Sequence, residues 1–506
     1  MQTLSRILFT SNLKPKGDFM PSVKLTLWKT ALILGMLLTS ICPTIAQTVF
    51  ARTYGGNSTD YGFSVQQTND SGYIIGGCTF PSGSSWPDFY LIKTNSMGDT
   101  LWTRAYGGTG DDEGYSVQQT TDSGYIISGI TYSYGSGGSD VYLIKTNSLG
   151  DTLWTRTYGG TDEDGGRSVK QTDDGGYIIG GFTFSYGSGG SDVYLIKTNS
   201  LGDTLWTRTY GGTSFDEGHS IEQTNDGGYI IAGDRFVDVY LIKTNSLGDT
   251  LWTRTYGGVS TEHGYSVRET NDSGYIIVGW TASFAQGWSD VYLIKTNSMG
   301  DTLWTRTYGG AANEAGYSVQ QTKDGGYIIG GWTSSFGVGN RDVYIIKTNS
   351  MGDTLWTRTY GGTDDDEGYS VQQTKDGGYI IGGYNDVSFG AQKYDVYLIK
   401  TDGNGLITNV SLNNLNVIPN EFILRQNYPN PFNPQTKISF SVPKESFITL
   451  KIYDLLGREV ATLVQDKKQQ GEYSVTWNAD NVPSGVYFYK LLAGDFIQTK
   501  KMILMK

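Results

Sequence analysis

The stretch DVYLIKTNSLGDTLWTRTYGG, Asp140 to Gly160, recurs with small changes along most of this chain of 506 residues. Its final Tyr-Gly-Gly begins at seven positions that are 52 residues apart, except for one interval of 46. These positions are Tyr54, Tyr106, Tyr158, Tyr210, Tyr256, Tyr308 and Tyr360. A period near 50 residues is too long for one coil of a β-helix and is typical of a four-stranded blade of a β-propeller.

Each copy contains four segments with strand character. In the second copy they are GYSVQQT (114–120), GYIISGIT (124–131), DVYLIKT (140–146) and TLWTRTY (152–158). Glycine, asparagine, aspartate and serine separate them and predict turns. The second and third segments are almost continuously apolar, which indicates strands covered on both faces by neighbouring sheets. No helical periodicity interrupts the pattern, so the fold class is all-β.

The phase of the repeat predicts a closed ring. After residue 46 the chain begins with TVFARTYGG, a fourth strand without the three that should precede it. The seventh copy ends after its third strand, at Lys400-Thr401. Pairing the orphan strand with the incomplete copy leaves no open end. We therefore expect a seven-bladed β-propeller over residues 47–405, with its N-terminal strand closing the last blade.

Residues 1–46 have the pattern of a secretory signal peptide. Lys24 and Lys29 precede an apolar run from Ala31 to Leu38, and the segment ends in small residues at Thr44-Ile45-Ala46. Met20 is an alternative start. The apolar run is too short to span a bilayer, so no membrane-spanning segment is expected in the mature chain.

Composition agrees with export. Removal of residues 1–46 takes away one acid, Asp18, and five basic residues, and changes the formal net charge from −12 to −16. An acidic chain disfavours nucleic acid and anionic membranes as partners. Cys78 is then the only cysteine, so no intramolecular disulfide can form, and we interpret it as a small core residue.

The repeat stops after Asp402, and residues 406–417 have the composition of a linker. Residues 418–506 follow a different pattern. Segments 437–443, 447–454, 471–477 and 485–494 alternate apolar and polar residues between turns. They predict a small antiparallel β-sandwich of immunoglobulin-like type.

Several motifs in this C-terminal region occur in a recognisable order. They are YPNPFNP at 428–434, IYD at 452–454 followed by Gly457-Arg458, GVY at 485–487 and KKM at 500–502. Together they resemble the type A C-terminal sorting domain of type IX secretion substrates. The resemblance implies recognition by the type IX machinery and passage across the outer membrane of a Bacteroidetes-like bacterium, followed by release or attachment to the surface. It implies nothing about the activity of the preceding repeats.

An acid stands two residues before a glycine in the loop that leads into the first strand of every copy. These acids are Asp60, Asp112, Asp164, Asp216, Glu262, Glu314 and Asp366. A ring of carboxylates could hold calcium, the one cofactor that the sequence suggests. Alternatively, each acid caps its turn or pairs with an arginine of the repeat such as Arg104 or Arg156. Sevenfold recurrence favours the structural role.

Aromatic residues occur in two settings. A tryptophan recurs in the fourth strand and is expected to pack between blades. The loops between second and third strands vary more and carry Trp86, Tyr134, Tyr186, Phe284, Trp288, Phe336 and Phe389. Such residues suit stacking on sugars or gripping a protein, but variable surface loops would look the same.

The fourth copy breaks the pattern. Its loop between second and third strands is shortened, and both histidines of the chain lie in or next to this copy. We expect the polar irregularities of this region to converge on one side of the ring as a ligand site, against the alternative of drift at tolerant positions. They are Arg167, His219, Asp234, Arg235, Glu262 and His263.

Two functions remain open from the sequence. The first is a secreted or outer-membrane surface protein for binding or adhesion, with a glycan or protein ligand. The second is a glycan-active propeller enzyme of the hydrolase or lyase type. Glycosidases need two carboxylates in unlike environments, whereas near-identical repeats supply acids in like ones. No catalytic residue is identified, because no nucleophile triad, zinc-ligand spacing or phosphate loop is present.

Overall fold

The structure is a computed structural model that describes residues 48–56, 58–81, 83–386, 393–407 and 422–505, apart from 425, 426, 428, 429, 431, 470 and 495. The chain divides into two compact units, Met1–Thr408 and Asn409–Lys506. The expected signal peptide, most of the expected linker and Phe389 lie outside the described residues.

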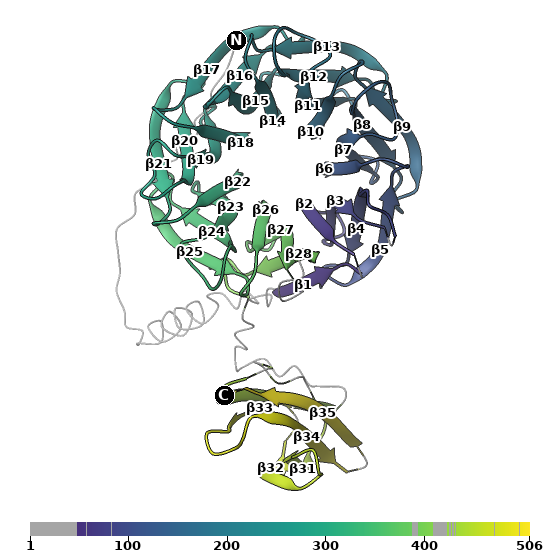
Figure 1. Cartoon of the computed structure of the whole chain (residues 1–506), viewed down its shortest axis with the longest axis vertical. Coiled ribbons are helices and arrows are strands. Elements are labelled where there is room, and N and C mark those ends of the chain that lie inside the picture. Colours follow the sequence, from purple (N-terminus) through teal and green to yellow (C-terminus); the bar gives the residue numbers. More distant parts are fainter. Residues whose placement is uncertain are drawn as a thin grey trace, which may run out of the picture. The chain divides into compact units, whose positions relative to one another are not determined.

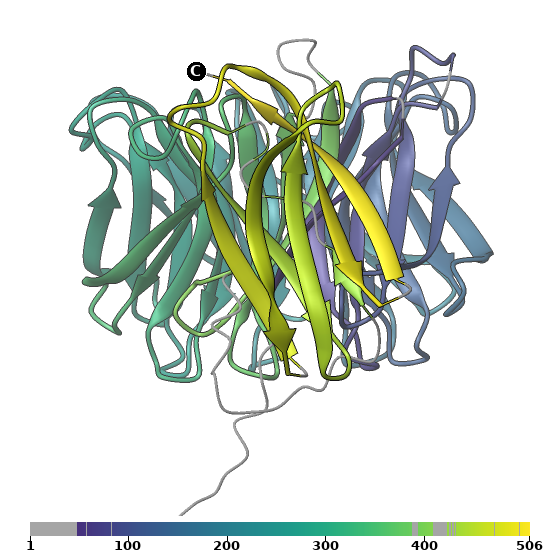
Figure 2. The same ribbon diagram turned by 90° about the horizontal axis from the view of Figure 1, so that it is seen from below.

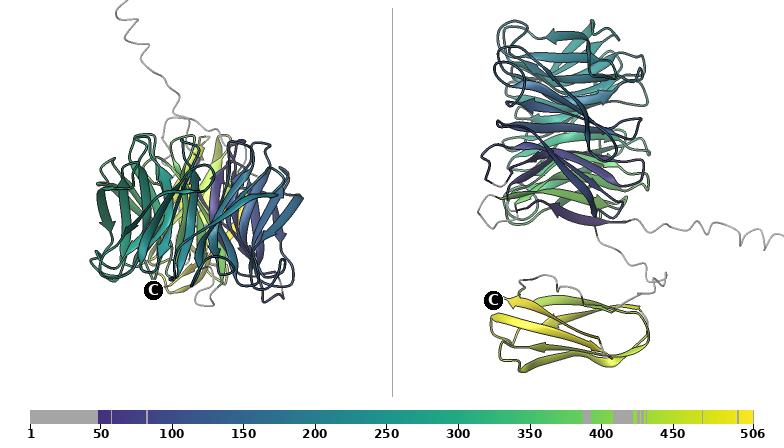
Figure 3. Two further views of the ribbon diagram at one scale, coloured as in Figure 1. Left: turned by 90° about the horizontal axis from the view of Figure 1, so that it is seen from above. Right: turned by 90° about the vertical axis from the view of Figure 1, so that its right-hand side faces the viewer.

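In the described part of the first unit, seven sheets of four antiparallel strands are arranged around a ring (Figure 1). Six sheets follow chain order: β2–β5 (Asp60–Gln67, Tyr73–Thr79, Asp88–Thr94, Thr100–Tyr106), β6–β9 (Asp112–Gln119, Tyr125–Thr131, Asp140–Thr146, Thr152–Tyr158), β10–β13 (Asp164–Gln171, Tyr177–Thr183, Asp192–Thr198, Thr204–Tyr210), β14–β17 (Asp216–Gln223, Tyr229–Arg235, Asp238–Thr244, Thr250–Tyr256), β18–β21 (Glu262–Glu269, Tyr275–Thr281, Asp290–Thr296, Thr302–Tyr308) and β22–β25 (Glu314–Gln321, Tyr327–Thr333, Asp342–Thr348, Thr354–Tyr360). The expected all-β class with propeller-like repeated sheets is confirmed. The strands run through the thickness of the ring, so the turns lie on two opposite faces (Figure 3).

The remaining sheet joins the two ends of the repeat region. It consists of β26 (Asp366–Gln373), β27 (Tyr379–Asp386), β28 (Tyr394–Thr401) and β1 (Phe50–Tyr54). Strand β1 pairs antiparallel with β28, with Phe50 opposite Lys400 and Tyr54 opposite Val396. The orphan N-terminal strand therefore completes the sheet of the last repeat, as the sequence predicts.

Apolar residues of adjacent sheets share each core. Ile178 and Leu195 of one sheet, for example, pack with Ile221, Tyr229 and Ile231 of the next. Trp206 of β13 packs at the edge of this core, with its ring centroid 6.0 Å from that of Tyr229. The predicted packing role of the fourth-strand tryptophans is thus confirmed. Because both faces of each sheet are covered, β11 and β12 are buried along their whole length.

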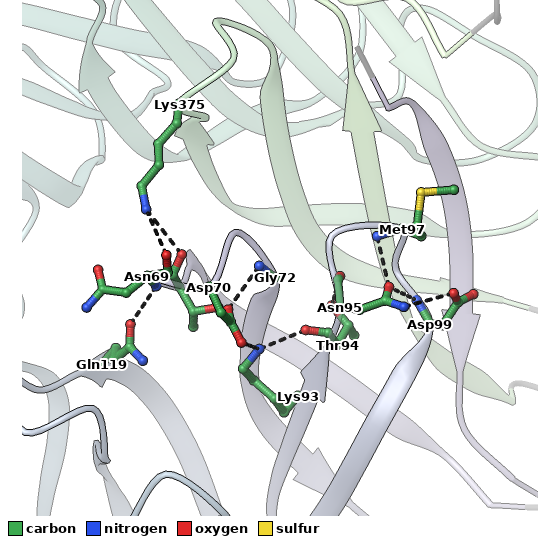
Figure 4. Close-up of polar contacts among 11 residues, drawn as sticks. Asn69, Asp70, Gly72, Lys93, Thr94, Asn95, Met97, Asp99, Gln119 and Lys375 are labelled. Carbon is green, nitrogen blue, oxygen red and sulfur yellow. Dashed lines mark hydrogen bonds and ion pairs between the residues drawn. The ribbon is translucent and has the colours of Figure 1, made fainter. Parts of the chain in front are cut away.

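Each repeat also carries a buried lysine that the sequence analysis did not single out. In the first copy Lys93 of β4 donates to Oδ2 of Asp70 and to the carbonyl oxygen of Thr94, each at 2.8 Å (Figure 4). Asp70 lies in the turn between β2 and β3 and also accepts the N–H of Gly72. The same ion pair recurs in all seven copies. It fixes the hairpin of the first two strands to the third.

The second unit contains two antiparallel sheets. One holds β29 (Ile423–Leu424), β30 (Gln435–Val442) and β33 (Gly471–Asn478), and the other holds β31 (Ser446–Tyr453), β32 (Glu459–Lys468), β34 (Gly485–Ala493) and β35 (Phe496–Leu504). The strands of this unit are coloured yellow-green to yellow in Figure 2. Phe440 of one sheet and Leu450 and Tyr489 of the other belong to one core. None of the described residues forms a helix that is long and apolar enough to cross a membrane.

Candidate functional site

The first strand of every sheet faces the centre of the ring (Figure 1), where these strands line a cavity of about 580 Å³, called here the central cavity. Each of these strands is irregular at the same place. In β2 the pairing register shifts between Gly62 and Ser64, and the equivalent shift occurs in the other six. Such a bulge redirects one side chain. At this position that side chain lines the central cavity.

The seven bulge residues form a collar, which consists of Phe63, Tyr115, Arg167, His219, Tyr265, Tyr317 and Tyr369. Successive aromatic rings contact one another, as in the stacked pair Tyr317 and Tyr369 with centroids 4.6 Å apart. The guanidinium of Arg167 lies 4.5 Å from the centroid of Tyr115, and the ring of His219 lies 5.3 Å from that of Tyr265. Two cationic or polar side chains thus interrupt an otherwise aromatic collar.

His219 belongs to a second group, the two-histidine cluster of His219, Asp234 and His263. Asp234 Oδ2 lies 2.8 Å from Nε2 of His219 and 2.6 Å from Nδ1 of His263, and Asp234 Oδ1 accepts the N–H of Gly264 at 3.0 Å. Burial by itself would raise the pKa of Asp234, but the charge of His219 and the hydrogen bonds from both histidines hold it well below its usual range. An ionised carboxylate only accepts hydrogen bonds, so both facing ring nitrogens carry hydrogens.

A tryptophan-rich depression adjoins this cluster. It is a cavity of about 390 Å³, called here the tryptophan hollow, and Trp280, Trp288 and Trp332 line it together with Tyr317. The ring of His263 lies 4.6 Å from that of Trp280. Ser289 and Asn313 add polar groups to its wall. Sequence reasoning missed this hollow. Trp280 and Trp332 stand at the same strand position as Cys78, so the sequence indicates core residues there rather than the wall of a cavity.

The six residues predicted as a site are only partly brought together. His219, Asp234 and His263 are in contact, and Arg167 lies in the collar. Arg235 turns away from the cluster, with Nε 3.7 Å from Oδ1 of Asp216 and its guanidinium 5.3 Å from the ring centroid of Tyr240. Glu262 is fully buried.

Glu262 and the six equivalent acids are bound within their own turns. Oε2 of Glu262 accepts the N–H of Gly258 at 2.9 Å, and Oε1 accepts the hydroxyl of Thr281 at 2.9 Å. A glycine N–H four residues earlier binds the acid in every copy. The hydrogen bonds match the turn-capping alternative. Arg104 and Arg156 do not pair with these acids, because they pair with Asp151 and Asp203 of the next copies instead.

No group of three or more histidine, cysteine, aspartate or glutamate side chains is placed to hold a metal ion in the part of the chain that the structure describes. The predicted loop aromatics are exposed at every described position: Trp86, Tyr134, Tyr186, Phe284, Trp288 and Phe336. Four of them pack against a tyrosine of the third strand, namely Tyr134, Tyr186, Phe284 and Phe336. The hydroxyls of Tyr134 and Tyr186 also donate to backbone carbonyls at 2.7 Å. Trp288 stands out with an exposed fraction of 79%.

Comparison with known proteins gives a family for the C-terminal unit and only distant likenesses for the repeats. The secretion system C-terminal sorting domain matches residues 426–505. The regulatory protein FlaEY of Caulobacter vibrioides is 27% identical over 219 residues, which make up 39% of this chain and 22% of FlaEY. This chain therefore spans only about a fifth of that relative.

Two solved structures are similar at a low level. PorZ, an essential surface component of the type IX secretion system of Porphyromonas gingivalis, is 12% identical with a TM-score of 0.34, covering 92% of this chain and 54% of PorZ. Sqt1 from Chaetomium thermophilum is 10% identical with a TM-score of 0.42, covering 66% of this chain and 82% of Sqt1. Neither likeness supports a functional comparison. The chain is thus a set of propeller-like repeats followed by the C-terminal sorting domain of a type IX secretion substrate.

Proposed function

We propose that this protein is a secreted or cell-surface binding protein, a seven-bladed propeller that the type IX machinery exports by means of an immunoglobulin-like sorting domain over residues 418–506. Its ligand is a glycan, held at the tryptophan hollow and the two-histidine cluster. The observation that carries this proposal is the position of Trp280, which lines the hollow and contacts His263.

The chemistry of the hollow suits a sugar. Aromatic faces stack on the C–H surfaces of sugar rings, and a few fixed polar groups orient the hydroxyls. Trp288 offers an exposed face, and Ser289 and Asn313 offer polar groups beside it. The indole N–H groups of Trp280 and Trp332 donate to the hydroxyls of Tyr265 and Tyr317, at 3.3 and 3.2 Å. These bonds hold the walls of the hollow before any ligand arrives.

The two-histidine cluster adds preoriented hydrogen-bonding groups. Asp234 engages one nitrogen of each imidazole, so the opposite nitrogens, Nδ1 of His219 and Nε2 of His263, are presented in a fixed orientation. A carboxylate that orients a histidine in this way restricts its ring rotation. Less conformational freedom is then lost when a ligand hydroxyl binds.

The alternative of a glycan-active enzyme has less support. Among the described residues that line the hollow, none is an aspartate or glutamate. The nearby carboxylate of Asp234 already accepts three hydrogen bonds and is ionised. Hydrolysis with an acid and a base needs a second carboxylate of raised pKa at the substrate.

A glycan array probed with the full mature chain, residues 47–506, tests the proposal. We expect retention of at least one glycan class, loss of that binding in Trp288→Ala, and unchanged binding in Trp86→Ala, which removes an exposed loop tryptophan of another sheet. Equal binding by Trp288→Ala and the unsubstituted chain contradicts the proposed site. Shortened glycans in the eluate, detected by mass spectrometry, would favour the enzyme instead.

A deletion tests the proposed export by the C-terminal region. Deleting residues 418–506 in a type IX-competent host should leave the chain in the periplasm, and the intact chain should reach the surface or the medium. Equal delivery of both forms to the outside contradicts the proposed role of this region.

A further inference from the structure

The central cavity has a charge opposite to that of the chain. The formal net charge of the whole sequence is −12. The charged residues that line the cavity are nevertheless Arg167, Lys170 and Arg268, with His219 beside them. No aspartate or glutamate occurs among the described residues of its lining. Arg167 and Lys170 stand on β10 and Arg268 on β18, and His219 stands on β14 of the sheet between them.

Two of these cations interrupt a repeated hydrogen bond. At five junctions between sheets, a side-chain oxygen on the first strand of one sheet accepts a backbone N–H on the first strand of the next, at 2.6 to 2.9 Å. Gln118, for example, accepts from Gln171. Lys170 and Arg268 occupy the same position in their strands. Lysine and arginine side chains contain only hydrogen-bond donors. Lys170 therefore cannot accept the backbone N–H of Gln223 on the next sheet, and Arg268 cannot accept that of Gln321.

The surroundings of Lys170 show that its charge is poorly compensated. Burial, and next the positive charge of Arg268, lower the pKa of Lys170 to about 8, and Glu222 opposes this shift. Glu222 stands on the intervening sheet and accepts the N–H of Glu269 at 2.9 Å. One carboxylate therefore faces two cations. Nε of Arg167 is also buried without a hydrogen-bond partner among the described residues.

These partly buried positions are costly for the fold, because cations held away from solvent and uncompensated donors are unfavourable. An oxyanion would satisfy the ammonium, the guanidinium groups and the backbone N–H groups together. The central cavity and the tryptophan hollow adjoin at Tyr317, which lines both.

We infer that the central cavity binds the anionic group of an acidic saccharide, a carboxylate or a sulfate, through Lys170, Arg268 and Arg167. The inference rests on the proposed glycan binding and names the class of glycan. Tyr317 is the residue that the lining of the tryptophan hollow shares with the lining of the central cavity. Free phosphate lacks the sugar part that the hollow would hold.

Calorimetric titration of the full mature chain tests the inference. The probes are trigalacturonate as the carboxylated saccharide, a carrageenan tetrasaccharide as the sulfated one, and neutral galactotriose. We expect at least one acidic probe to bind about tenfold or more tightly than galactotriose, which corresponds to about 1.4 kcal/mol. The affinity should fall as salt is added. Which acidic probe binds identifies the anion.

Lys170→Gln and Arg268→Gln are the informative variants, because glutamine stands at this position in four other sheets and restores the missing acceptor. Each should weaken the acidic probe about tenfold and leave the circular dichroism spectrum unchanged. Lys323→Gln, which removes an exposed charge outside the cavity, should bind like the unsubstituted chain. Wild-type affinity in both cavity variants, or equal affinity for acidic and neutral probes, overturns the inference.

The outcome separates the two proposals. Retention of neutral glycans on the array, lost in Trp288→Ala but unaffected by Lys170→Gln, overturns the anion site and leaves glycan binding in place. No binding of any glycan in either experiment overturns both.

Discussion

His263 Nδ1 lies 2.6 Å from Asp234 Oδ2 across the boundary between two sheets. The chain contains two histidines, and both bind this one carboxylate. Asp234 stands where other copies have a cysteine or an apolar or aromatic residue, such as Cys78 or Trp332. One sheet boundary has therefore exchanged apolar packing for a hydrogen-bonded ionic group that reaches the central cavity.

Asp234→Asn should destabilise the fold, because an amide cannot replace an ionised acceptor of three hydrogen bonds. We expect a loss of about 1–3 kcal/mol of unfolding free energy at pH 7. Since the pKa of Asp234 is lowered in the fold, its stabilisation is present above the pKa of an unfolded aspartate and is lost as pH falls through the folded value. The difference between variant and wild type should therefore shrink toward pH 3.

Urea unfolding at pH 7 and pH 3 measures this difference, and Asp173→Asn serves as an exposed control. A difference that stays constant over this range contradicts an ionised, hydrogen-bonded Asp234.

Asp366 should have the opposite pH dependence. Burial raises the pKa of Asp366 to about 7, with the N–H of Gly362 opposing the shift and the negative charge of Asp342 adding to it. A carboxyl group whose folded pKa is raised favours the fold when protonated, and that stability is lost as pH rises from about 4 through about 7. Asp366→Asn, which stays neutral, should raise the melting temperature at pH 8 and leave it nearly unchanged at pH 4.

Differential scanning calorimetry at the two pH values gives the result, with Asp364→Asn as the neighbouring control. A lower melting temperature for Asp366→Asn at pH 8 would show that the charged form stabilises the turn.

We expect the buried lysine–aspartate pairs to stabilise the repeated sheets. Asp70→Ala leaves Lys93 buried without its carboxylate, and breaking a buried pair typically costs about 3–5 kcal/mol. Because Asp70 is largely exposed, we expect about 1–3 kcal/mol. Adding Lys93→Met should recover much of this loss. Denaturant unfolding of the single and the double variant measures the two free energies of unfolding. If the double variant is no more stable than Asp70→Ala, the unpaired lysine is not the source of the lost stability.

We expect the ring to unfold cooperatively only when β1 closes it. Deleting residues 47–56 removes β1 and exposes the edge of β28, to which it is hydrogen-bonded. Exposed strand edges favour association with other chains. The truncated chain should aggregate or lose its single cooperative unfolding transition in calorimetry combined with light scattering. Unfolding at the wild-type temperature as a monomer would mean that β1 does not hold the ring closed.

The repeat arrangement was predictable because each copy carries its own turns and strand pattern, so period and phase specify the sheets. The pairing of β1 with β28 followed from counting strands. The pair of Lys93 and Asp70 was not foreseen, since the two residues lie 23 positions apart and neither departs from ordinary composition. Only the register of β3 and β4 brings them together.

The contact of His219 and His263 with Asp234 was foreseeable in part, because these residues break the repeat. Arg235 and Glu262 were expected beside them, but their side chains lie elsewhere. Successive side chains of a strand point to opposite faces, so Arg235 cannot accompany Asp234, and Glu262 cannot accompany His263. The collar depends on a bulge and the tryptophan hollow on contacts between sheets, and neither is visible in the order of residues.

We expect the ligand to bind beside the two histidines. Nuclear magnetic resonance of residues 47–506 with ¹⁵N-labelled histidine and tryptophan tests this expectation, because only two imidazoles contribute signals. During titration with a glycan retained on the array, the resonances of His219 and His263 and the indole resonance of Trp288 should shift together, and that of Trp86 should not. Unchanged imidazole signals at saturation, with a shift of Trp86, would contradict binding at this site.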